Sequence, residues 1–131
     1  MKITIISTEK VNSKYTKEAI SEYSKRLSAF TKIEYIVSKN PTKDIPNNTY
    51  VIQINTKGKN ITSEELAQKM DYITTHGQSH IVFLLNISLD ISSDFSLAIS
   101  PMEIGMDILP IVLYEQIYRA FTIISGKTYH K

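Results

Sequence analysis

Residues 114–131 read YEQIYRAFTIISGKTYHK, a helix-like segment followed by a short polar tail. Apolar side chains recur here at helical spacing as far as Gly126, and glycine commonly ends a helix. Tyr129, His130 and Lys131 then close the sequence with an aromatic ring, a titratable imidazole and a cation. Because chain ends are usually poorly ordered unless they are tied down, we expect this tail to reach into a functional site.

The rest of the chain alternates between strand-like and helix-like patterns. Thr62-Ser63-Glu64-Glu65 is a capping-box pattern that opens one of the helices, and Pro110 suits the first turn of another. This alternation is typical of an α/β fold in which helices pack on a mainly parallel sheet. The predicted strands are residues 2–7, 32–37, 50–54, 80–85 and 95–99; the predicted helices end near residues 30, 77 and 126; residues 38–48 are predicted as a loop and 56–60 as a polar turn.

Composition excludes several classes of site. The chain has 131 residues, the size of one domain (1–131), and its 15 basic and 13 acidic residues give a net charge of only +2. It has no cysteine, and its three histidines lack the spacing of a metal site, so no metal is expected. We find neither a signal-peptide pattern nor an apolar run long enough to span a membrane. The sequence therefore predicts a cytoplasmic protein without a membrane partner.

Motifs along nearly the whole chain resemble one family. The tail pattern YEQxYRAxxIxxGxxYHK, the pair Gly58-Lys59 before SEELA (residues 63–67), and the strand SHIVFLL (79–85) are similar to those of SPOUT methyltransferases. The resemblance is to the ribosomal RNA large subunit methyltransferase H family, which modifies pseudouridine. It implies an α/β fold with a C-terminal trefoil knot, a homodimer, S-adenosylmethionine as cofactor, and the ribosome or large-subunit rRNA as partner.

The same resemblance assigns roles to individual residues. Tyr129, His130 and Lys131 match the family's tail, which borders the substrate pocket at the dimer interface, so they are the predicted catalytic residues. An imidazole there could help the pseudouridine N3 lose its proton during methyl transfer. Leu85, Asn86 and Ile87 match the cofactor loop, and Arg119 and Lys59 are candidate RNA contacts, although the pattern around Lys59 favours a plain polar turn.

Two segments depart from the family pattern. Asn86 and Ile87 stand where the family has two glycines against S-adenosylmethionine, and Ile87 adds four carbons there. Residues 104–107 and Pro110 replace an FPHQ-like segment and an arginine. The sequence predicts weak S-adenosylmethionine binding and leaves three functions open. These are an rRNA methyltransferase, a non-catalytic paralogue that binds the ribosome or RNA, and a protein with another ligand in a reshaped pocket.

Two features of the last predicted helix also have alternative interpretations. Glu115 and Arg119 are four residues apart, which suits a surface ion pair, but Arg119 could instead contact a phosphate or a partner subunit. The stripe Ile117, Phe121 and Ile124 has helical spacing and belongs either to the core or to a dimer interface.

Overall fold

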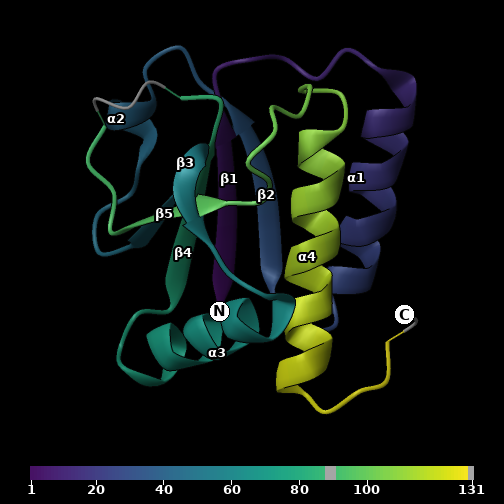
Figure 1. Ribbon diagram of the computed structural model, residues 1–131, viewed down its shortest axis with the longest axis vertical. Helices are drawn as coiled ribbons and strands as arrows, with labels where there is room; N and C mark the ends of the chain where they lie inside the picture. Colours follow the sequence, from purple (N-terminus) through teal and green to yellow (C-terminus); the bar gives the residue numbers. More distant parts are fainter. Residues whose placement is uncertain (88–90, 130–131) are drawn as a thin grey trace.

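A five-stranded, all-parallel sheet forms the centre of the computed structural model, which describes residues 1–87 and 91–129 (Figure 1). The strand order is β2-β1-β4-β3-β5, and every neighbouring pair is parallel. This confirms the predicted α/β fold with a parallel sheet flanked by helices. The elements are β1 (Lys2–Ser7), α1 (Lys14–Leu27), β2 (Lys32–Val37), α2 (Pro41–Asp44), β3 (Tyr50–Asn60), α3 (Ser63–Thr75), β4 (His80–Leu85), β5 (Phe95–Ala98) and α4 (Leu109–Ile124).

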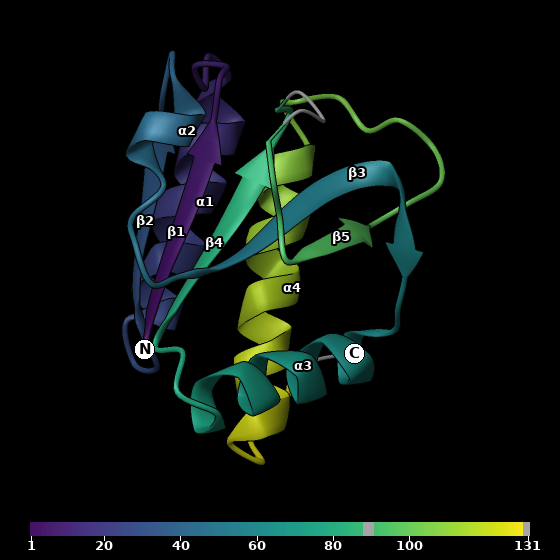
Figure 2. The same cartoon turned by 90° about the vertical axis from the view of Figure 1, so that its left-hand side faces the viewer.

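The central strand β4 is buried on both faces, which explains its nearly continuous apolar sequence. Its residues alternate between two clusters, because successive side chains of a strand point to opposite faces. Ile81, Phe83 and Leu85 face the main core, which α1, α3 and α4 cover. Val82 and Leu84 face a smaller cluster with Ile6, Val51 and, at its margin, Ile36, Ile45, Ile87 and Ile91. In Figure 2, α1 and α4 lie behind the sheet and α2 lies in front.

Helix α3 begins at the predicted capping box. The Thr62 hydroxyl accepts a hydrogen bond from the Glu65 amide at 3.1 Å, and the Glu65 carboxylate accepts one from the Thr62 amide at 2.9 Å. These two bonds satisfy amides that the first turn of a helix leaves unpaired. Hydrogen bonding to the Thr62 amide also lowers the pKa of Glu65, so its carboxylate stays ionised at neutral pH.

Two predicted irregular segments contain regular structure. Residues 38–48 were predicted as a loop, but Pro41 starts the one-turn helix α2 there, because its fixed φ suits a first helical position. Residues 56–60 were predicted as a polar turn, but they form the far half of β3. Both Ile54 and Lys59 pair with Leu97, so the residues between them arch out of the ladder where β3 passes β5 (Figure 2).

Gly58 makes the close passage of β3 past β5 possible. A Cβ atom at this position would lie 2.7 Å from the Leu97 carbonyl carbon and 2.8 Å from the Ser96 carbonyl carbon. Real Cβ atoms do not approach backbone atoms so closely, so only glycine fits without moving a strand. This is a structural reason for the glycine of the Gly58-Lys59 pair.

Helix α4 ends as its sequence predicts. Gly126 takes a φ of +72°, the Lys127 amide donates to the Thr122 carbonyl at 2.9 Å, and the Gly126 amide donates to the Ile123 carbonyl at 3.2 Å. This pair of bonds is the Schellman arrangement that turns the chain after a helix. None of the helices in the described part of the chain is both long and apolar enough to cross a membrane.

The apolar stripe of α4 divides between core and surface. Ile117 and Phe121 are buried against the chain's own sheet and helices, whereas Ile124 is partly exposed. The first two residues therefore belong to the core of this chain and are unavailable to a partner.

Candidate functional site

A cavity of about 310 Å³ opens beyond the end of β4, beside the middle of β3 and the segment that leads into α4. In open parallel sheets, ligands bind at the carboxyl ends of strands, so this is the position where a ligand site is expected. The lining combines apolar, polar and charged side chains. It consists of Ile54, Asn55, Thr56, Lys57, Asn86, Ile87, Ile99, Ser100, Met102, Glu103, Ile104, Met106 and Leu109.

The loop after β4 enters the cavity at Asn86, whose φ is +52°. Asparagine is one of the few residues besides glycine that tolerates this left-handed conformation. The Asn86 carbonyl accepts a hydrogen bond from the Thr8 hydroxyl at 3.1 Å, which fastens the loop to the end of β1. Asn86 therefore holds a backbone shape that a glycine would also adopt.

Ile87 lines the same cavity but also packs against the smaller apolar cluster on the far face of the sheet. Its carbonyl accepts a hydrogen bond from the Gln53 side-chain amide at 3.3 Å. Because the positive φ lies at Asn86, Ile87 itself is not forced into a left-handed conformation. Leu85, which was predicted together with these two residues, is fully buried in the main core and does not line the cavity.

The opposite wall comes from the arch of β3, which the sequence did not predict as part of the site. The Asn55 side-chain carbonyl accepts a hydrogen bond from the Lys57 amide at 2.9 Å, and the Asn55 amide group donates to the Ser96 hydroxyl. These bonds fix the arch, so that Lys57 borders the cavity. The sequence did contain a signal for this turn, because an asparagine side chain commonly accepts a hydrogen bond from the backbone amide two residues later, as Asn55 does from Lys57.

The segment before α4 forms the third wall. Ile104 and Met106, from the segment that departs from the family pattern, line the cavity together with Glu103. The Thr16 hydroxyl of α1 donates a hydrogen bond to the Asp107 carbonyl at 2.5 Å and so holds this segment against α1. Pro110 is buried in the first turn of α4 and lies outside the lining.

Tyr129, the described residue of the predicted catalytic tail, packs against α4. The Tyr129 ring stands edge-on to Tyr118, with 4.9 Å between ring centroids, and the Arg119 guanidinium lies 4.8 Å from its centroid. Burial, followed by hydrogen bonding to Tyr23 and the negative charge of Glu115, raises the pKa of Tyr129 far above its usual value. The phenol therefore stays protonated at neutral pH. His130 and Lys131 lie outside the described residues.

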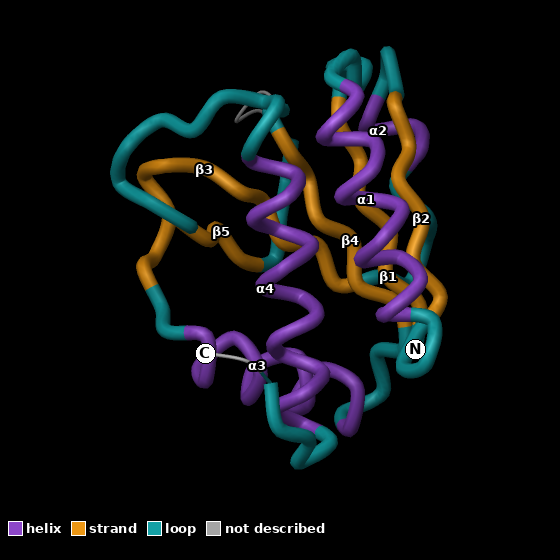
Figure 3. Tube along the Cα trace, turned by 90° about the vertical axis from the view of Figure 1, so that its right-hand side faces the viewer, coloured by secondary structure: helices purple, strands orange, loops and turns teal. Residues whose placement is uncertain are grey.

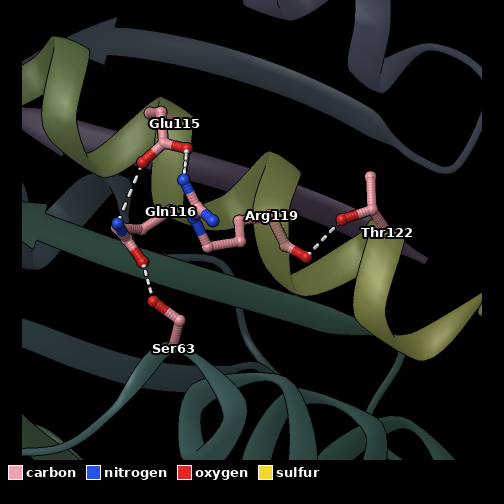
Figure 4. Close-up of polar contacts among 5 residues, drawn as sticks. All are labelled: Ser63, Glu115, Gln116, Arg119 and Thr122. Atoms are coloured by element: carbon pink, nitrogen blue, oxygen red, sulfur yellow. Dashed lines mark hydrogen bonds and ion pairs between the residues drawn. The ribbon is translucent and has the colours of Figure 1, made fainter. Parts of the chain in front are cut away.

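Arg119 belongs to a chain of polar contacts between α4 and the start of α3 (Figure 4). Its guanidinium donates to Glu115 at 2.9 Å, so the predicted ion pair is present. The other Glu115 oxygen accepts from the Gln116 amide at 2.9 Å, and Gln116 in turn accepts from the Ser63 hydroxyl at 2.6 Å. Because both charged side chains are about three-quarters buried, this pair is better shielded from water than an ordinary surface pair.

The cavity and Tyr129 lie at different positions along the axis of α4. Leu109, at the start of the helix, lines the cavity, whereas Tyr118 holds the tail. At a rise of about 1.5 Å per residue, the two levels are about 14 Å apart along the helix axis. Figure 3 follows α4 between the loop at its start and the turn at its end. One chain therefore does not bring Tyr129 to its own cavity.

Lys59, the second candidate RNA contact, is exposed on β3 and does not line the cavity. It borders a separate hollow beside α3. Within residues 1–87 and 91–129, no three His, Asp or Glu side chains gather closely enough to hold a metal ion.

Comparison with known proteins identifies the family to which this chain belongs. Residues 1–130 match the family described as predicted SPOUT methyltransferase. The chain is 38% identical to the ribosomal RNA large subunit methyltransferase H of Clostridium botulinum, 36% to that of Ruminiclostridium cellulolyticum and 34% to that of Acetivibrio thermocellus. Each alignment covers 100% of both chains. The chain therefore belongs to the SPOUT methyltransferase family.

Proposed function

We propose that this protein transfers a methyl group from S-adenosylmethionine to N3 of a pseudouridine in large-subunit rRNA. The observation that carries the proposal is the cavity at the end of β4, in which Asn86 keeps a left-handed backbone without a glycine. The names of full-length relatives, which are methyltransferases of large-subunit rRNA, support the substrate.

The cavity residues fit the proposed cofactor. Its volume of about 310 Å³ lies at the lower end of the range for small-molecule sites. Ile54, Ile99 and Leu109 offer apolar surface for an adenosine, while Lys57 and Glu103 offer charges complementary to the carboxylate and ammonium of a methionine group. When bound, S-adenosylmethionine would supply an electrophilic methyl group on a sulfonium.

The tail would supply the remaining chemistry. In this proposal the His130 imidazole accepts the N3 proton, and the Tyr129 phenol and the Lys131 ammonium stabilise the negative charge that develops on the pseudouridine. Arg119 and Tyr118 position Tyr129 through the ring contacts described above. The raised pKa of Tyr129 suits a hydrogen-bond donor and does not suit a base.

A homodimer would bring the two halves of the site together. Because Tyr129 lies about 14 Å along α4 from its own cavity, we propose that each tail borders the cavity of a second copy. Ile108 and Met102, near the cavity, are exposed apolar side chains that such a contact would cover. The family likeness further supports a cytoplasmic enzyme with a C-terminal trefoil knot.

Calorimetric titration with S-adenosylmethionine, followed by assay of methyl transfer to large ribosomal subunits that lack the modification, tests the function. We expect binding and the appearance of one methylpseudouridine by mass spectrometry. The C. botulinum relative provides the matched positive control. The replaced residues 104–107 favour the alternative, a non-catalytic paralogue that binds the ribosome. Ribosome binding without cofactor binding or methyl transfer would establish that alternative.

The double variant Asn86→Gly, Ile87→Gly is expected to bind S-adenosylmethionine about tenfold more tightly than the wild type, a gain of about 1.4 kcal/mol. The reason is that the variant removes a β-branched side chain from the cavity wall, where the family has glycine. Titration calorimetry measures the change.

Ile91→Ala is the matched control for this variant, because Ile91 packs against the same apolar cluster but does not line the cavity. It should lower stability without changing cofactor affinity. An unchanged affinity in the double variant, with the fold retained by circular dichroism, would mean that Ile87 does not obstruct the cofactor.

A further inference from the structure

A second concave surface, which we call the α3 hollow, lies between the far half of β3, the start of β5 and the exposed face of α3. It has a volume of about 400 Å³ and shares no lining residue with the cavity. Its lining consists of Lys59, Ile61, Glu65, Gln68, Lys69, Tyr72 and Phe95. The proposed methyl-transfer chemistry uses none of these residues.

The hollow carries two cations, and one of them is held against aromatic rings. The Lys69 ammonium lies 4.1 Å from the centroid of the Phe95 ring and 5.4 Å from that of Tyr50, so two aromatic rings hold it. Lys59, from β3, is the second cation of the lining. Glu65 is the single acidic residue of the lining, and its carboxylate is engaged by the Thr62 amide. The lining thus has an excess of positive charge.

Tyr72 gives the α3 hollow an exposed aromatic ring beside these cations. Its side chain is 63% exposed, although a tyrosine ring is a large apolar group. The His76 imidazole stacks on it, with 3.8 Å between ring centroids and 19° between planes, while His76 Nδ1 donates a hydrogen bond to the Tyr72 carbonyl at 2.8 Å. Tyr72 lines the hollow and His76 does not, so the imidazole supports the ring from outside.

We propose that the α3 hollow binds an unpaired nucleotide of the RNA substrate, with its base stacked on Tyr72 and its phosphates beside Lys59 and Lys69. An exposed aromatic ring next to cations is the combination by which proteins hold single-stranded nucleic acid. The Gln68 amide offers hydrogen bonds to a base edge. This inference rests on the proposed function for the identity of the RNA.

The position of the hollow suits RNA that also reaches the cavity. Lys57 lines the cavity and Lys59 lines the hollow, although only Gly58 lies between them in β3. In a strand this separation is about 7 Å. A flexible RNA segment can therefore place its target base at the mouth of the cavity, beside the cofactor, and a neighbouring nucleotide on Tyr72.

The test measures binding of a fluorescein-labelled 12-nucleotide single-stranded RNA, and of the same sequence as a duplex, across a range of salt concentrations. Tyr72→Ala should weaken single-strand binding about tenfold and leave the salt dependence unchanged, because stacking is lost and charge is retained. Lys59→Gln with Lys69→Gln should lower the salt slope by about 1.4, since each phosphate contact on a single strand contributes about 0.7. Lys59→Gln alone, which leaves the Phe95 contact intact, should lower it by about half as much.

Tyr15→Ala and Lys17→Gln are the matched controls, because both residues are exposed on α1, away from the hollow. They should leave RNA binding unchanged. The proposal is overturned if the Tyr15 and Tyr72 variants lose RNA binding equally, or if the wild type binds no RNA. A change in solution mass on Tyr72→Ala would also overturn it, because the hollow would then be a contact between copies of the chain. Methyl transfer is assayed separately, so RNA binding by the hollow can be measured even if the protein transfers no methyl group.

Discussion

Deleting residues 129–131 is expected to lower the rate of methyl transfer by about 100- to 10,000-fold, the usual contribution of a positioned acid or base. S-adenosylmethionine binding should change little, because the lining of the cavity comes from residues 54–109 and does not include Tyr129. Single-turnover transfer of a labelled methyl group to ribosomal subunits measures the loss, and titration calorimetry measures cofactor binding.

Stability separates a chemical role of the tail from a structural one. The deletion removes the Tyr129 contacts with Tyr118 and Arg119, and one aromatic pair contributes about 1 kcal/mol. The thermal midpoint should therefore fall by roughly 4 °C. Tyr129→Phe is the control that keeps the ring but removes the hydroxyl. If the deletion lowers the thermal midpoint several times more than this, the tail is needed for the fold. The loss of activity would then result from unfolding and would not indicate a catalytic role.

Gly58→Ala is expected to lower the free energy of unfolding by about 1–3 kcal/mol, the usual cost of forcing an extra carbon into a packed interior. The new Cβ would lie 2.7 Å from a backbone atom of Leu97 and 2.8 Å from one of Ser96, so a strand must move to admit it. Urea unfolding followed by circular dichroism measures the change.

Gly105→Ala is the matched control for Gly58→Ala. A Cβ at Gly105 would meet nothing within 4 Å, so this change should be neutral or slightly stabilising. If both variants unfold at the same urea concentration as the wild type, the close passage of β3 past β5 is not a constraint on the native fold. Because Lys57 lies beside Gly58 on the cavity wall, Gly58→Ala should also weaken cofactor binding.

The strands and helices with strong patterns were predictable from the sequence. The apolar run of β4 indicated a central parallel strand, and Thr62 with Glu65 marked the start of α3. The far half of β3 was not predictable, because Lys57, Lys59 and Asn60 are polar and the segment becomes a strand only through pairing with β5. No local pattern in a sequence reveals that pairing.

The candidate site was predictable to a similar degree. Family resemblance directed attention to Asn86 and Ile87, and both line the cavity. The same argument included Leu85, although the alternation along β4 places its side chain in the main core. The arch at Lys57 and the aromatic platform at Tyr72 depend on tertiary neighbours. Periodicity alone identifies Tyr72 only as an exposed residue of a helix.

The sheet order has a consequence for how the chain folds. Ile3 of β1 pairs with both Ile33 and Ile81, and the second of these partners is synthesised long after the first. Pairing between such distant segments makes folding slow, because a long loop must close before any ladder forms. On the ribosome, β1 can pair only with β2 until β4 has emerged. The nascent chain therefore exposes an unpaired edge of β1 until β4 is complete, and such an edge is prone to aggregation. Native-state hydrogen exchange should be slowest at the β1–β4 ladder, where opening requires the centre of the sheet to separate.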